Sequence, residues 1–90
     1  MRADQLLPDH LNAGDFNGVT VRKGTVGAFL INARVWTSHS ADEATRASAA
    51  ADIVDALPAL RALGLFDVLD VRDPALRRLI DAHTASEVGA

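Results

Sequence analysis

The chain has 90 residues, a length that corresponds to one small domain. Nine basic and twelve acidic residues give a formal net charge of −3, which disfavours electrostatic attraction to nucleic acid or to an anionic membrane. The absence of cysteine excludes disulfides, thiolate metal sites and cysteine nucleophiles.

The N-terminus and the apolar runs indicate a cytoplasmic protein. Residues 1–10 lack the apolar segment of a secretory signal. The longest apolar run, residues 26–31 with its glycine included, is far shorter than the ~20 residues that a membrane-spanning helix needs. Alanine is abundant and arginine outnumbers lysine eight to one, a bias that fits a bacterium with GC-rich codons. We therefore expect a bacterial, cytoplasmic protein that does not contact a membrane.

The first part of the chain predicts little regular structure. Residues 3–13 are compatible with a short helix or a turn, which Pro8 interrupts. Residues 12–18 contain two glycines and two asparagines, a composition typical of a loop. The alternating sequence VTV that follows predicts a short strand or hairpin near residues 18–22, which could pair with residues 67–71.

An amphipathic helix is predicted for residues 26–36. Its apolar residues recur with helical spacing and comprise Val26, Phe29, Leu30, Ala33 and Trp36 or Val35. We expect the hydroxyl of Thr25 to cap the helix, and Asn32 and Arg34 to lie toward its other side. A strand through the same residues is the alternative, because β-branched residues are present.

The next helix is predicted from Ala41 to about Leu57, because Ser40 and Glu43 have the spacing of a capping box. Its larger apolar side chains form one stripe, which comprises Ala50, Ile53, Val54 and Leu57. Its small side chains form a second stripe, a candidate interaction surface that comprises Ala44, Ala47, Ser48 and Ala51. Small residues let another backbone approach closely, and that backbone belongs either to the helix at 26–36 or to another molecule.

The remaining residues predict at most two more helices. Pro58 either kinks the preceding helix or opens a short one that ends at Gly64. Residues 67–71 are ambiguous between a strand and a turn. Asp73 and Pro74 predict the start of the last helix, as its cap and first residue. The buried face of that helix is expected to comprise Leu76, Leu79 and Ile80, with His83 at its edge.

Together these elements predict a mainly α fold with a minor β part. We expect a compact bundle of three to four helices, with the short strand or hairpin near residues 18–22. A single globular domain should span residues 1–90, and residues 1–5 and 84–90 are expected to fray.

The segment from Gly24 to Gly27 does not match a phosphate-binding loop. That loop needs four residues between its glycines and a lysine after the second, whereas Lys23 precedes Gly24. We therefore expect Gly24 to be a turn residue. Anion binding at the following helix start remains an alternative. The candidate anion contacts are Arg22, Lys23, Arg77 and Arg78.

No group of residues predicts catalysis. No two of the three histidines lie at helical spacing, so a metal site is not expected. Ser38 or Ser40 can be combined on paper with His83 and Asp81, but no strained nucleophile turn accompanies them. We expect no catalytic residue, no cofactor and no metal, and we do not expect an enzyme.

Two segments, "KGTVGAFLINARVW" and "ALPALRALGLFDVL", resemble a family of small uncharacterised bacterial proteins. The first resembles that family's turn glycine, Thr-Val and apolar helix with an internal asparagine. The second resembles its helix, proline and Gly-Leu-Phe. The family's tryptophan-containing, glycine-rich tail is missing here. The resemblance implies that Gly24 and residues 64–66 belong to the fold, and it implies no activity.

We expect a non-enzymatic protein-interaction module, acting through self-association or a protein partner. The alternative is a nucleic-acid-binding or regulatory protein, with a helix-turn-helix-like pair at 41–57 and 58–63 and with Arg77 and Arg78 as contacts. The acidic net charge counts against that alternative. A small hydrolase is a third hypothesis.

Overall fold

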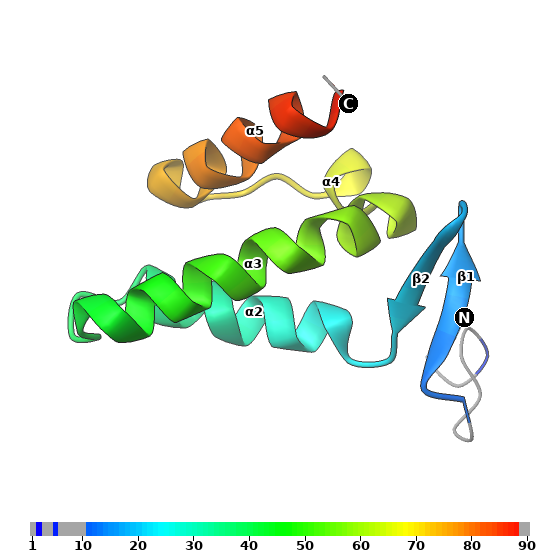
Figure 1. The fold of residues 1–90 in the computed structure, drawn as a ribbon, viewed down its shortest axis with the longest axis horizontal. Coiled ribbons are helices and arrows are strands. Elements are labelled where there is room, and N and C mark those ends of the chain that lie inside the picture. The colour runs from blue at the N-terminus through cyan, green and yellow to red at the C-terminus, as the bar shows by residue number, and fades with distance from the viewer. Residues whose placement is uncertain (1, 3–4, 6–10, 89–90) are drawn as a thin grey trace.

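Helix α3 (Glu43–Leu63) is the longest element, and the other elements pack around it (Figure 1). The computed structural model describes residues 2, 5 and 11–88. The elements in these residues are, in order, β1 (Ala13–Phe16), β2 (Val19–Arg22), α2 (Thr25–Trp36), α3, α4 (Leu65–Val68) and α5 (Pro74–Val88). Helix α3 contacts each of the five others. The predicted mainly α fold with a small β part is confirmed.

The core is built on one face of α3. Ile53, Leu57 and Leu60 follow each other at helical spacing, and all three are fully buried. Burying a side chain of this size stabilises the fold by roughly 1.5–3 kcal/mol. The side chains that complete the buried cluster come from α2 and α5 and comprise Phe29, Ala33, Leu76 and Ile80.

A β-hairpin precedes the helices, where the sequence predicted a loop and then one strand. β1 and β2 pair antiparallel, from Ala13 opposite Arg22 to Phe16 opposite Val19. Asn17 and Gly18 connect them, and both have positive φ angles, 51° and 81°. This is the Asn-Gly signature of a two-residue hairpin loop, so the prediction of a loop over residues 12–18 is wrong.

The hairpin is attached to the end of α3, and not to residues 67–71 as predicted. The side-chain amide of Asn17 donates to the carbonyl oxygen of Ala62 at 2.7 Å. That carbonyl lies in the last turn of α3, where the helix itself supplies no donor. Val21 is buried, whereas its neighbours Thr20 and Arg22 are exposed, as expected for a strand with one face toward the protein.

Helix α2 confirms the helix predicted at 26–36, but two details of the prediction are wrong. Thr25 is the first helical residue and does not cap the helix, because its hydroxyl donates to the carbonyl oxygen of Arg22 at 2.7 Å. Gly24, at φ 87°, is the residue before the helix. The helix also faces differently from the expected stripe: Leu30 is 55% exposed, whereas Asn32 is half-buried.

Helix α3 begins later and ends later than predicted. Asp42 caps it by accepting the backbone N–H of Thr45 at 2.7 Å, so the Ser40 capping box is wrong. The hydroxyl of Ser40 instead contacts that of Ser38. Pro58 lies inside the helix, which continues to Leu63. The separate helices at 41–57 and 58–63 are therefore not formed, and neither is the helix-turn-helix-like pair.

The chain reverses direction at Gly64 and returns along α3. Gly64 has a φ angle of 82°, and its N–H donates to the carbonyl oxygen of Arg61 at 3.0 Å, which confirms the predicted helix end. In α4 the ring of Phe66 meets the ring of Phe29 edge to face, with 6.1 Å between centroids. Residues 67–71 include the end of α4 and a segment without regular structure, so they form no strand.

Helix α5 starts as the sequence predicts. Asp73 accepts the N–H of Leu76 at 2.9 Å, and Pro74 is the first helical residue. Leu76 and Ile80 are buried, and Leu79 packs against the cluster. His83 is half-buried. The helix or turn predicted at 3–13 falls mostly outside the described residues, as does the fraying predicted for 1–5. Of residues 84–90, which were predicted to fray, 84–88 continue α5 and 89–90 lie outside the described residues.

Substitutions at Gly24 and Gly27 test whether the turn before α2 needs a glycine. A methyl group added at either position meets no atom within 4 Å, so the two substitutions differ only in backbone conformation. Gly24→Ala should lower the free energy of unfolding by about 1 kcal/mol, because its φ angle is positive. Gly27→Ala, inside α2, should raise it by about 0.5 kcal/mol. Urea denaturation measures both values, and equal effects would contradict this account.

The cap of α3 should make stability depend on pH. The hydroxyl and the backbone N–H of Thr45 lower the pKa of Asp42 below its ordinary value of 3.8. The charged cap therefore stabilises the fold fully above about pH 4 and stops doing so as the pH falls through the lowered pKa. Asp42→Ala should reduce the melting temperature at pH 7 and have little effect near pH 2. Asp42→Asn, a cap without a titrating group, is the control.

Candidate functional site

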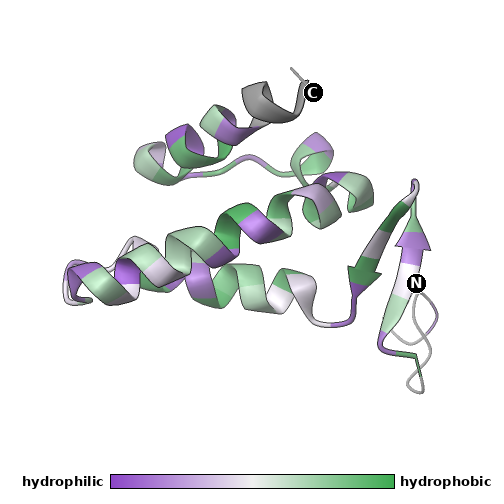
Figure 2. Cartoon of the chain, in the orientation of Figure 1, coloured by the Kyte–Doolittle hydropathy of each residue, from purple (hydrophilic) through white to green (hydrophobic). Residues whose placement is uncertain are grey.

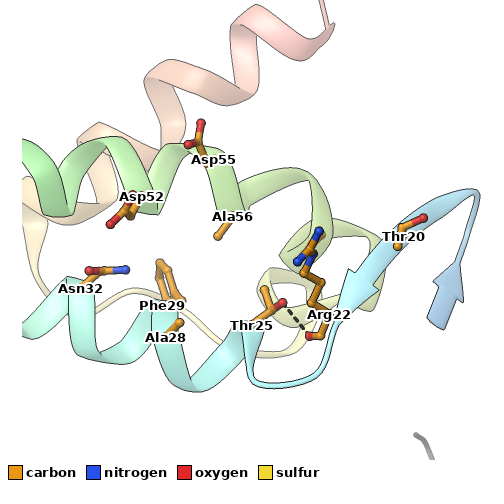
Figure 3. A pocket seen from close by; sticks show the side chains of 10 residues that line it. Thr20, Arg22, Thr25, Ala28, Phe29, Asn32, Asp52, Asp55 and Ala56 are labelled. Carbon is orange, nitrogen blue, oxygen red and sulfur yellow. Dashed lines mark hydrogen bonds between the residues drawn. The ribbon is translucent and has the colours of Figure 1, made fainter. Parts of the chain in front are cut away.

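A groove runs between α2 and α3 and ends at the hairpin (Figure 3). It has a volume of about 430 Å³. Its apolar part consists of small side chains and the edge of a buried ring, from Ala28, Phe29, Ala56 and Ala59. Its polar part comprises Thr20, Arg22, Thr25, Asn32, Asp52 and Asp55. The groove exists because small residues lie where the two helices diverge from their shared core.

The charges of the groove are separated along its length. Figure 3 shows Asn32 and Asp52 facing each other across it, and Arg22 at the end next to β2. The side chains of Arg22, Asp52 and Asp55 are exposed. Within the described part of the chain, none of these three side chains has a hydrogen bond or an ion pair. Their charges are therefore available to a binding partner.

The small-residue stripe predicted on α3 leads directly into this groove. Along an α-helix, residues four apart form continuous rows on the surface. One such row comprises Ala44, Ser48, Asp52 and Ala56, and the next comprises Ala47, Ala51, Asp55 and Ala59. We call these two rows the α3 rows. The stripe and the groove are thus parts of one surface.

The four residues of the stripe are all exposed. The alternative that α2 of the same chain packs on them is therefore wrong. Helix α2 instead packs on the neighbouring side of α3, where Ala49 and Ile53 are buried. Sequence reasoning selected this stripe for its small side chains, but it missed Asp52 and Asp55, which continue the same rows.

Helix α2 carries exposed apolar residues that do not line the groove. It is more hydrophobic than α3 or α5 (Figure 2). Ile31 is 66% exposed, and it follows the groove residue Ala28 by three positions, which places the two on the same side of the helix. Val26 and Leu30, one turn apart on the other flank, are also exposed. We call the α3 rows, the groove and Ile31 together the α2/α3 face.

The four candidate anion contacts lie in two separate places. Arg22 is the last residue of the hairpin and lines the groove, and Lys23 follows it. Arg77 lines a second hollow of about 390 Å³ between α4 and α5. There it donates to the carboxylate of Asp70 at 2.6 Å and to the carbonyl oxygen of Val71 at 2.9 Å. Arg78, the next residue of α5, is exposed and does not line that hollow.

Trp36 and the residues of the hydrolase hypothesis make contacts that belong to the fold. Trp36 packs against the core, and the guanidinium of Arg46 lies 5.8 Å from its ring centre. In α5, Nδ1 of His83 is 2.9 Å from the carbonyl oxygen of Leu79. Among the described residues, no hydrogen bond joins Ser38 or Ser40 to this histidine.

The described residues contain no cluster of three or more histidine, cysteine, aspartate or glutamate side chains arranged to hold a metal ion. None of their helices is both long enough and apolar enough to cross a membrane.

Comparison of the chain with protein-family models, curated proteins and solved structures finds no significant match. The resemblance to a family of small bacterial proteins therefore stays a prediction.

Nucleic-acid binding can be tested at Arg77. Because its guanidinium is already bound to Asp70, we expect duplex DNA and RNA to bind no more tightly than the non-specific range of ~10⁻⁴–10⁻⁶ M at physiological salt. Arg77→Ala should leave that affinity unchanged. Fluorescence anisotropy with labelled duplexes measures both. Submicromolar, salt-sensitive binding that this substitution weakens would favour the nucleic-acid hypothesis.

Proposed function

We propose that the protein is a non-enzymatic, cytoplasmic protein-interaction module that binds its partner through the α2/α3 face. The observation that carries the proposal is the combination of a highly exposed Ile31 with a groove whose apolar lining consists of three alanines and Phe29. Burial of apolar surface of this kind is the main favourable term in protein association. A surface that combines apolar with polar and charged side chains is also common in interfaces.

The small side chains of the α3 rows favour a helix as the bound element. Alanine and serine let two helix axes approach closely, because their side chains extend little from the backbone. The four N-terminal members of these rows are exposed, whereas Ala56, near their other end, packs against the core. A partner helix that lies along them would contact the groove and Ile31 at the same time.

The proposal can be tested by placing a photocrosslinking amino acid at position 31. Ile31→benzoylphenylalanine should yield a covalent product with another polypeptide, because the side chain lies on the proposed interface. The matched control is Arg78→benzoylphenylalanine, an exposed site on α5 that lies outside the face. The experiment is done in cells, and the products are identified by mass spectrometry. Equal, low crosslinking at the two positions would contradict the proposal.

A further inference from the structure

The distribution of charge along the groove indicates what kind of partner fits it. The groove has carboxylates on α3, at Asp52 and Asp55, and a guanidinium at the hairpin end, from Arg22. Asn32 faces Asp52, and it lies seven residues after Thr25, the first residue of α2. At 1.5 Å per residue, Asn32 is therefore about 10 Å along α2 from the end next to Arg22. Negative and positive charge thus lie at different positions along one surface, and neither is neutralised within the described residues.

We propose that the α2/α3 face binds a second copy of the same chain across a two-fold axis, with Arg22 of each copy against Asp52 and Asp55 of the other. The inference rests on the proposed function, because it names the partner of the same face. A two-fold interface brings a surface against a reversed copy of itself. Residue i of the first copy therefore meets residue j of the second, and residue j of the first meets residue i of the second. A surface with separated opposite charges is complementary to itself under that operation.

The side chains between the charges are suited to such an axis. Ala28 and Ala56 line the groove from opposite helices, and both are small. Helices of the two copies can therefore approach closely near the axis. Because Asn32 faces Asp52, Ile31 lies at about the level of Asp52, and the reversal that brings Asp52 of one copy against Arg22 of the other carries Ile31 to the same end of the partner's groove. The dimer would bury an isoleucine that one chain leaves 66% exposed.

Among the described residues, the helices after α3 leave the groove open. Residues of α4 and α5 contribute to the core, and none of them lines the groove. Two copies of the antiparallel pair α2–α3 would pack as a four-helix arrangement, a stable way to bury such faces. A different protein with a small-residue helix and complementary charges is the competing occupant, and the experiment below separates the two.

The test uses charge reversal on each side of the groove. One variant is Arg22→Asp, and the other is the double variant Asp52→Arg, Asp55→Arg. In either variant alone, like charges meet at both symmetric contacts, and the dimer dissociation constant should rise by about tenfold or more. In an equimolar mixture of the two variants, every contact again pairs opposite charges, so a mixed dimer should form with near wild-type affinity.

Sedimentation equilibrium measures the outcome against the chain mass of 9.5 kDa. All three substituted residues are exposed, and circular dichroism verifies that the variants fold. Arg78→Asp makes the same charge change outside the face and should leave the dimer unaffected. A wild type that stays monomeric up to about 1 mM would overturn the inference. So would a dimer that the reversals do not weaken, or that mixing does not restore.

The failure of this inference is distinguishable from the failure of the proposed function. If the wild type is monomeric but position 31 crosslinks to a different polypeptide, the interaction module stands and self-association is overturned. If the wild type is monomeric and position 31 crosslinks to nothing, both are overturned.

Discussion

The burial of Ile53, Leu57 and Leu60 on one face of α3 is the interaction on which the other elements depend. A chain of 90 residues has few large apolar side chains, so one helix face must serve as the common surface for all other elements. Helices α2, α4 and α5 each turn apolar residues to it, and the hairpin is attached to its C-terminal end through Asn17. Loss of that face would leave the surrounding elements without a shared core.

The same arrangement produces the α2/α3 face. Because the core lies to one side of α3, the opposite side needs no large residues, and it carries alanine, serine and aspartate. Helix α2 meets the core with Phe29 and Ala33, while its other sides remain on the surface. The groove forms where these two helices separate beyond their common contact. Its shape is thus a consequence of core packing, and its charges are additions that the core does not require.

Local chemistry explains most of the element boundaries. Gly24 and Gly64 have positive φ angles, and each lies directly before or after a helix, where backbone of that kind is needed. At the start of α3 two caps compete, and Asp42 prevails over Ser40. A charged carboxylate near the positive end of a helix has an electrostatic advantage that a neutral hydroxyl lacks. Pro58 does not end α3, because the buried residues on both sides of it hold the helix together.

The sequence by itself determined helix α2, most of α3, the turns at Gly24 and Gly64 and the start of α5, since these follow from spacing and capping over a few residues. Only the tertiary structure decided which way α2 faces. Its periodicity allowed Leu30 to lie in the core and Asn32 outside, whereas contact with α3 and Phe66 selected the side that carries Phe29 and Ala33. The groove could not be predicted from the sequence either, because three elements contribute to it and their mutual placement depends on packing.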